Sequence, residues 1–376
     1  MKILSIAKFV DQPLVINKLQ KLMPTILTGG AIAYGTAKTL QQPHEKRKEA
    51  LTKNAIVLGS TVAASIVAAH GLKIGKSKLL KGLMPPEDTQ KLIYNQKKAI
   101  EKYLQSEKNI SQNVLTILEK AKNQPLKISE ITTVLDKTQK NENQQKLFST
   151  LFGKQEDFSS KTIFAEMKRL PIYGASAIGG GLFGGLLADK LTNTDSKKAT
   201  ANKVKEAFYQ YFANTFLCIV GSGSALLAAE KLNKVGVIKN LTPAKKMTAV
   251  ISGILGMGVV FGSLAANIVG KKIINPIFCQ NDKKECQNKI YSERKPELLD
   301  VCMHADDLAT AGIYSGFKWI EPVLPLFYLI GGYRAGMGYR NNNACNVQDE
   351  KKINNCKKRI QNQNPHTNCQ PQKASC

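Results

Sequence analysis

Cysteines are the residues of this sequence with the most distinctive chemistry, since thiols form disulfides and bind metals. Of the eight cysteines, seven stand in polar segments towards the C-terminus, namely Cys279, Cys286, Cys302, Cys345, Cys356, Cys369 and Cys376. Cys-x-x-Cys spacing is absent, and a lone Cys302-x-His304 is weak evidence for a metal. Disulfides in an oxidising compartment are the first interpretation, unpaired surface thiols the second and a metal site the third.

Lys318 and Glu321 are the ionisable residues that could line a polar path through a membrane. They stand three residues apart within the apolar stretch 308–333, so they share one face of a helix there and could neutralise each other. The alternative is that they mark the interface at which this stretch enters the membrane, and this alternative is favoured. His70 precedes Lys73 and is expected at an interface for the same reason.

No motif in the sequence indicates an enzyme. The chain has no nucleophile elbow, no P-loop, no zinc-protease motif and no dinucleotide-binding fingerprint. Gly179-Gly180-Gly181 lies inside a long apolar run and follows no predicted strand, so it is not a phosphate loop. We therefore expect no catalytic activity, no cofactor and no metal ion.

The elements that would position these residues are five uncharged runs. They cover residues 22–37, 54–72, 170–188, 207–229 and 247–270, and are 16, 19, 19, 23 and 24 residues long. About 20 helical residues cross a hydrocarbon core of ~30 Å. The runs are apolar on all faces and most have lysines at their ends, which is typical of lipid-facing helices. The sequence predicts an all-α, polytopic membrane helix bundle of five or six spans; a soluble helical bundle is the alternative.

Small residues recur at every fourth position inside these runs. Four-residue spacing places them on one face of a helix, and in lipid close backbone approach is what holds helices together. The predicted packing residues are Ala177, Gly181, Gly185, Gly221, Gly258, Gly262 and Ala266. Packing within one chain and packing between copies in a homo-oligomer both fit this pattern.

The polar segments divide the chain into further units. Residues 1–21 are predicted as an amphipathic helix and residues 22–72 as a membrane hairpin. Residues 73–169 are a polar insert with apolar stripes at helical spacing, which predicts a small helical extramembrane domain. The remaining units are three spans in 170–270, a cysteine-containing loop at 271–307, a sixth span or re-entrant segment at 308–340, and a polar, disordered tail at 341–376.

Charge and composition limit the function. The 376 residues include 54 Lys and Arg against 28 Asp and Glu, a net charge of +26, and 43% are hydrophobic, which excludes a fully disordered chain. Attraction to anionic lipid headgroups explains the lysines more simply than nucleic acid does. Positive charges are equal on the two predicted sides, so orientation stays open. We expect a structural or interaction protein of a membrane; a transporter or pore is the alternative, and a basic nucleic-acid-binding protein the second alternative.

Overall fold

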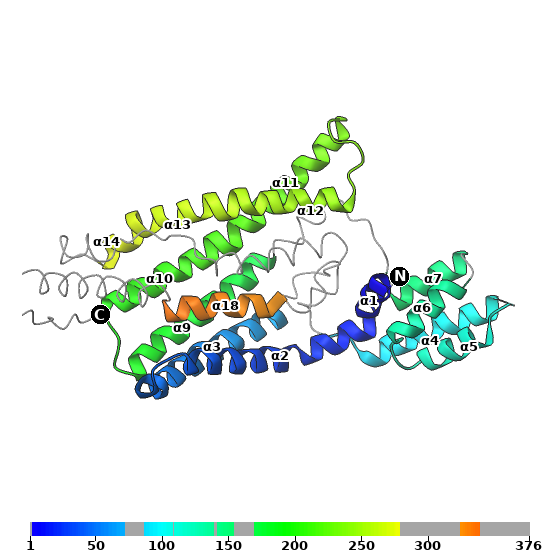
Figure 1. Ribbon diagram of the computed structural model, residues 1–376, viewed down its shortest axis with the longest axis horizontal. Coiled ribbons are helices and arrows are strands. Elements are labelled where there is room, and N and C mark those ends of the chain that lie inside the picture. The colour runs from blue at the N-terminus through cyan, green and yellow to red at the C-terminus, as the bar shows by residue number, and fades with distance from the viewer. Residues whose placement is uncertain are drawn as a thin grey trace, which may run out of the picture.

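A computed structural model describes residues 2–71, 86–107, 109–138, 141–153, 169–278 and 324–338 of the chain. These residues contain helices and no strand, which confirms the predicted all-α class. Figure 1 shows an elongated helix bundle with a smaller group of helices at one end, from α4 (Thr89–Ser106) to α7 (Glu142–Leu151), beside α1 (Lys2–Val10).

The bundle consists of helices that are long by themselves or are joined end to end. They are α2 (Pro13–Leu40), α3 (Arg47–Gly71), α9 (Arg169–Leu191), α10 (Lys197–Tyr211), α11 (Leu217–Lys234), α12 (Pro243–Gly253), α13 (Ser263–Val269), α14 (Asn275–Phe278) and α18 (Leu324–Met337). A π-helical segment, Phe212–Phe216, joins α10 to α11 without a break. Two more, Ile254–Gly262 and Gly270–Ile274, join α12, α13 and α14 into one long helix.

Four helices in the described part of the chain are long and apolar enough to cross a membrane. They are His44–Gly71, Arg169–Leu191, Ala199–Lys234 and Lys245–Phe278. These helices contain four of the five predicted runs, apart from residue 72 at the end of the second, which lies outside the described residues, so candidate membrane helices are confirmed at this level. The run at 22–37 lies inside α2, which is not among the four.

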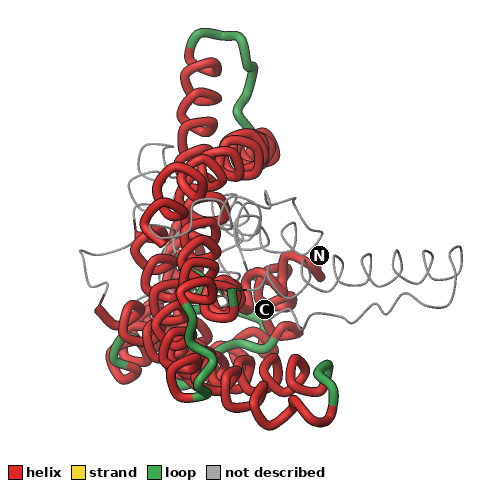
Figure 2. The backbone as a smooth tube through the Cα atoms, turned by 90° about the vertical axis from the view of Figure 1, so that its left-hand side faces the viewer, coloured by secondary structure: helices red, strands yellow, loops and turns green. Residues whose placement is uncertain are grey.

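The helices pack in an order that follows the chain, apart from α18. α3 lies against α2 and α9, α10 lies against α9, and α11 lies against α12. α18, which comes last in the chain, packs against α2, α3, α9 and α10. Figure 2 shows the helices in end view, with the loop between α11 and α12 standing out from the rest.

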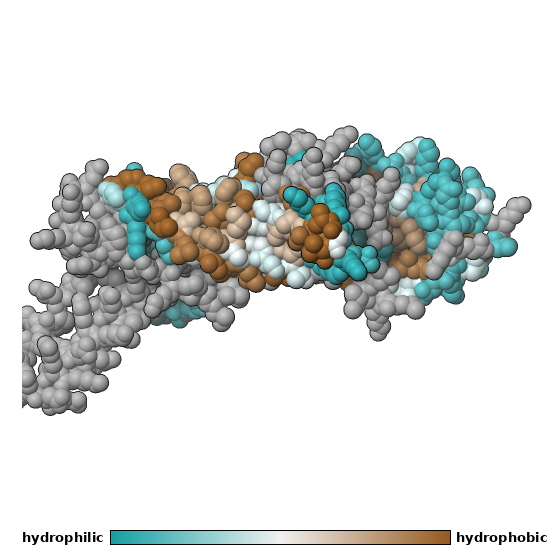
Figure 3. Space-filling view, turned by 90° about the horizontal axis from the view of Figure 1, so that it is seen from above, coloured by the Kyte–Doolittle hydropathy of each residue, from teal (hydrophilic) through white to brown (hydrophobic). Residues whose placement is uncertain are grey.

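The bundle exposes several large apolar side chains and buries some polar and charged ones. On α9, Phe183 is 64% and Leu187 38% exposed, whereas Asp189 is only 6% exposed. On the helix that runs from α12 to α14, Phe261 and Ile268 are exposed at 63% and 52%. Figure 3 shows hydrophobic residues over this part of the bundle and mainly hydrophilic residues over the α4–α7 end.

Residues 1–21, predicted as one amphipathic helix, belong to two helices. α1 (Lys2–Val10) ends before Gln12, and α2 starts at Pro13. Proline suits the first turn of a helix, because the amide hydrogen it lacks would have no partner there. α2 then continues to Leu40, so the predicted N-terminal segment and the first apolar run share one helix.

Four further helices pack around a second core. They are α4 (Thr89–Ser106), α5 (Gln112–Ala121), α6 (Ile128–Lys137) and α7 (Glu142–Leu151). Ile100, Leu118, Ile131 and Leu147 are almost completely buried in this core. All four belong to the apolar stripes of the predicted insert. The helices therefore meet through the faces that helical spacing marked in the sequence.

Gln12 connects this group to the bundle. Its side-chain amide donates to the Leu126 carbonyl at 2.8 Å and accepts from the Leu126 amide at 2.7 Å. Asn17 of α2 donates to the Glu87 carbonyl at 2.7 Å, just before α4 begins. These contacts hold the α4–α7 group against the start of α2.

Candidate functional site

Two glycine faces of α9 meet two different helices. A Cβ atom built on Gly181 would overlap the carbonyl group of Gly332, and one built on Gly185 would overlap that of Gly336, so this face lies directly against the backbone of α18. Residue numbers rise in the same direction along the two helices, from Gly181 to Gly185 and from Gly332 to Gly336, so α9 and α18 are parallel. Ala177 is fully buried beside the same contact.

The second glycine face of α9 lies against α3. Cβ atoms on Gly180 and Gly184 would each approach Ser60 closer than van der Waals contact allows. Only glycine lets three backbones lie this close. α9 is therefore held between α3 and α18.

The other predicted packing residues also lie between helices. Gly221 of α11 and Gly253 of α12 contact each other's backbones, and Gly258 lies against Cys218. Gly262 faces Ala213, and Ala266 is buried with Ala213 and Tyr209. All seven residues thus stand at helix–helix contacts. The partners Gly332, Gly336 and Gly253 were not among the predicted residues.

A buried ionic cluster joins α3, α9 and α10. Asp189 of α9 pairs with Lys203 of α10, and both residues are 6% exposed. The Lys203 ammonium also donates to the Gly185 carbonyl at 3.1 Å. Lys53 of α3 lies 3.9 Å from the same carboxylate. A buried carboxylate needs such partners, because losing water without them is expensive.

A hydrogen-bonded ladder of polar side chains runs from α10 into the π-helical segment that follows it. The Gln210 side-chain amide donates to the Glu206 carboxylate at 2.7 Å, and the Asn214 side-chain amide donates to the side-chain oxygen (Oε1) of Gln210 at 2.8 Å. These three residues are at most 3% exposed. Arg334 of α18 is fully buried, and α18 packs against α10. The interior of the bundle therefore holds both signs of charge.

The π-helical segment at the end of the ladder changes the local hydrogen bonding. The Thr215 hydroxyl donates to the Gln210 carbonyl at 3.4 Å, and the Cys218 thiol donates to the Ala213 carbonyl at 3.0 Å. Each donor stands five residues after its acceptor, as the wider π-helical turn permits. These side chains therefore add hydrogen bonds to backbone carbonyl groups at the π-helical turn.

A third polar contact connects α18 to the α2–α3 hairpin. The Tyr333 hydroxyl donates to the Asn54 side chain at 2.8 Å, and Asn54 donates to the Thr39 hydroxyl at 2.9 Å. Both Tyr333 and Asn54 are buried. This chain of hydrogen bonds fixes α18 relative to α2 and α3.

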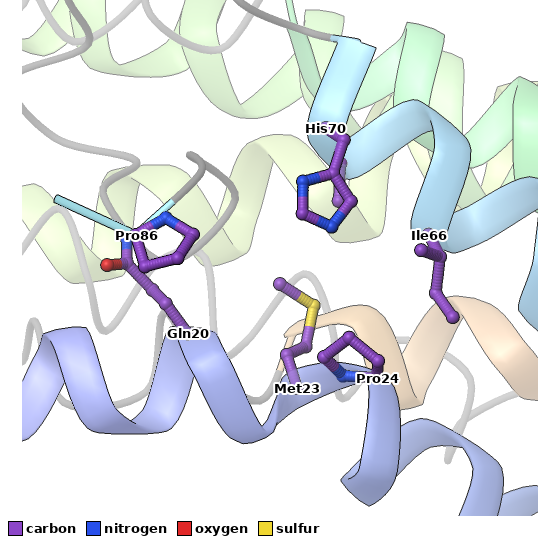
Figure 4. Close-up of a pocket in the computed structure, with 7 residues that line it drawn as sticks. Gln20, Met23, Pro24, Ile66, His70 and Pro86 are labelled. Atoms are coloured by element: carbon purple, nitrogen blue, oxygen red, sulfur yellow. The ribbon is translucent and has the colours of Figure 1, made fainter. Parts of the chain in front are cut away.

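A small pocket lies where α2 and α3 approach Pro86 (Figure 4). Gln20, Met23, Pro24, Ile66, Ala69, His70 and Pro86 line it. Its empty space of about 250 Å³ includes its open mouth. The part of it that is open to the centre of a water molecule is about 10 Å³, far below the range of about 300–1,000 Å³ of typical ligand pockets. His70 is exposed at the end of α3, and its interface position stays a prediction.

Other predicted site residues lie outside the described part of the chain. These are Lys318, Glu321, Cys279, Cys286, Cys302, Cys345, Cys356, Cys369 and Cys376. Within the described ranges, the Cys218 side chain is buried, and no group of three His, Cys, Asp or Glu could hold a metal.

Sequence reasoning missed the ionic cluster because charged residues were used to end the apolar runs. Asp189, Lys203 and Glu206 stand just beyond those ends, where charge normally marks an interface. The four-residue spacing of Glu206, Gln210 and Asn214 is the signal that could have revealed the ladder.

No protein-family model, curated protein or solved structure matches the chain.

Proposed function

We propose that the chain is an integral membrane scaffold. In this proposal α2, α3, α9, the helix from α10 to α11 and the helix from α12 to α14 cross the bilayer, and α18 packs among them. The α4–α7 group lies outside the lipid at one membrane surface. The spans are held together by their glycine and alanine faces and by the buried polar contacts.

Exposed phenylalanine side chains together with buried carboxylates are the observation that carries this proposal. A protein in water buries its large apolar side chains, yet here Phe183 and Phe261 are exposed while Asp189 and Glu206 are buried. Lipid removes the cost of exposing phenylalanine and raises the cost of exposing a carboxylate. Exposed apolar and buried charged side chains of this kind support a hydrocarbon solvent around the bundle.

The directions in which the helices run give the bundle two ends, and this supports helices that cross a membrane. The α2–α3 turn, the α9–α10 turn, Phe278 and Gly338 lie at one end, since Gly338 contacts Lys203 and α14 packs against α10. The α11–α12 loop and the α4–α7 group lie at the other end (Figure 1). On this arrangement each end faces one side of the membrane.

Carbonate extraction of cell membranes tests the membrane proposal. We expect the full chain to stay in the pellet after washing at pH 11 and to be released only by detergent. A double variant, L255K/F261K, places two charges on the exposed apolar face, at about 2.5–3.5 kcal/mol each in a span, and should lower the membrane-bound fraction.

Tyr94→Lys is the matched control for this test. Tyr94 is 62% exposed on α4, outside the proposed lipid region, so this variant should behave like the wild-type chain. Release of the wild-type chain by carbonate would overturn the proposal.

Ion transfer is a second candidate function, and the polar ladder favours it. Ionisable groups inside membrane spans commonly mark ion or proton pathways. Glu206, Gln210 and Asn214 form a hydrogen-bonded series inside a candidate span, and Glu206 stands three residues after Lys203 on the same helix. Glu206 would be the group that binds and releases a proton or small cation.

Flux measurements in proteoliposomes separate the two candidates. Proton uptake driven by a potassium diffusion potential should be lost in Glu206→Gln, which keeps the side-chain size and removes the carboxylate charge. Glu230→Gln makes the same change near the end of α11 and should retain the flux. If the wild-type chain shows no flux, ion transfer is refuted and only the scaffold proposal remains.

Nucleic-acid binding is the least supported alternative. The Thr132 hydroxyl of α6 hydrogen-bonds with Ser5 of α1 at 2.8 Å, so α1 occupies part of the α6 surface. Contact with anionic headgroups and assembly into a homo-oligomer stay predictions.

A further inference from the structure

The loop between α11 and α12 exposes apolar side chains in an ordered turn. We call residues 231–246 the α11–α12 tip. Leu232, Val235 and Val237 are 41%, 65% and 70% exposed there. Figures 1 and 2 show the tip standing out sideways from the long axis of the bundle.

Hydrogen bonds fix the shape of the tip. The Val237 amide donates to the Leu232 carbonyl at 3.0 Å, and the Gly236 amide donates to the Asn233 carbonyl at 3.2 Å. This pair of bonds is the Schellman ending of a helix, and the φ of +81° at Gly236 is the left-handed conformation that it requires. The turn therefore holds Val235 and Val237 outward by its own backbone.

The tip is also strongly basic. It carries five lysines, Lys231, Lys234, Lys239, Lys245 and Lys246, and no acidic residue. The adjacent Glu230 forms an ion pair with Lys234 at 3.6 Å. Exposed valines within a group of lysines combine an apolar surface with positive charge.

We propose that the α11–α12 tip docks on the anionic headgroups of the bilayer that holds the bundle. This inference rests on the proposed membrane location. The tip connects two candidate spans, Ala199–Lys234 and Lys245–Phe278, so it lies where the chain would leave the hydrocarbon. Its sideways projection lays it along that surface, with the valines entering the headgroup region and the lysines reaching phosphate oxygens.

Charge and shape together favour lipid over an acidic protein partner. An acidic protein would satisfy the lysines, but it would have to fit a loop that lies flat against the membrane. Lipid headgroups satisfy the lysines and the valines at once, because the boundary between headgroups and acyl chains accepts both.

Tryptophan fluorescence in lipid discs tests the inference. Trp319 is the single tryptophan, so V237W/W319F places one indole at the tip. The full chain is reconstituted in discs of phosphatidylcholine and phosphatidylglycerol, with bromine on the acyl chains of one lipid or the other. We expect at least twofold stronger quenching when the phosphatidylglycerol is brominated, and weak quenching by acrylamide in the water.

Charge variants then identify the cause of the preference. Lysine-to-glutamine changes at 231, 234 and 239 should bring the quenching ratio of the two lipids close to one. The control changes Lys91, Lys98 and Lys102 to Gln, all exposed on α4, and should leave the ratio unaltered.

Two results would overturn the docking proposal. Equal quenching by the two lipids with strong acrylamide quenching would place the tip in water. Protection from both lipids and acrylamide would mean that protein covers it. Carbonate extraction of the same variant shows whether the membrane location itself has failed.

Discussion

Gly181 of α9 and Gly332 of α18 lie backbone to backbone, at a distance that leaves no room for a Cβ atom. The contact joins helices that are far apart in the sequence. Gly179, two residues earlier on α9, has no atom within 4 Å of the position its Cβ would take. α9 therefore has one glycine at a helix contact and a nearby glycine with open space around it, which serves as the control position.

Gly181→Leu should separate α18 from α9. The larger side chain meets backbone, which cannot rotate away, and overpacking of this kind costs about 1–3 kcal/mol or more. The melting temperature of the purified chain in detergent, followed by size-exclusion chromatography, should fall. Gly179→Leu points outward and should leave the melting temperature nearly unchanged. Equal melting of the two variants would contradict the close contact.

Asp189→Asn should destabilise the bundle by about 3–5 kcal/mol, because Lys203 would stay buried without its carboxylate. Thermal unfolding in detergent measures the loss. The double variant D189L/K203M removes both charges and should recover most of the stability, since an apolar pair of similar size can replace a buried ion pair. Lys190→Gln, at an exposed neighbouring position, is the control. Failure of the double variant to exceed the single one would argue against pairing.

Gln12→Ala should loosen the α4–α7 group without affecting membrane association. The buried amide and carbonyl of Leu126 would lose their partners, at about 1–3 kcal/mol. Hydrogen–deuterium exchange should become faster around Leu126 while the glycine contacts of α9 remain protected. Gln105→Ala, an exposed position on α4, should change neither. Unchanged exchange at Leu126 would show that Gln12 is not the anchor.

Impermeant thiol labelling should divide the chain into two sides. In a cysteine-free background, single cysteines at Gln42 and Thr194 should react from the same side of sealed vesicles. Cysteines at Val237 and Gln112 should react only from the opposite side, because the helices between these positions run from end to end of the bundle. Reaction of Gln42→Cys and Val237→Cys from one side would refute the proposed crossing of the spans.

Local patterns in the sequence were enough to determine the helical class. Uncharged runs of helical length separate the polar segments, and four of them lie in helices long enough to span a membrane. The apolar stripes around Ile100 and Leu118 likewise marked the faces that form the second core. These properties depend on neighbours within a few turns, so the order of residues alone reveals them.

Which face meets which helix was decided only by the tertiary structure. The spacing of Gly181 and Gly185 predicts a helix face without side chains. The sequence does not show that Gly332 and Gly336 pack on that face. The pairing of Asp189 with Lys203 and of Gln12 with Leu126 depends in the same way on how distant segments are brought together. Sequence spacing determines which side chains share a surface, whereas contact between surfaces depends on the packing of all the helices at once.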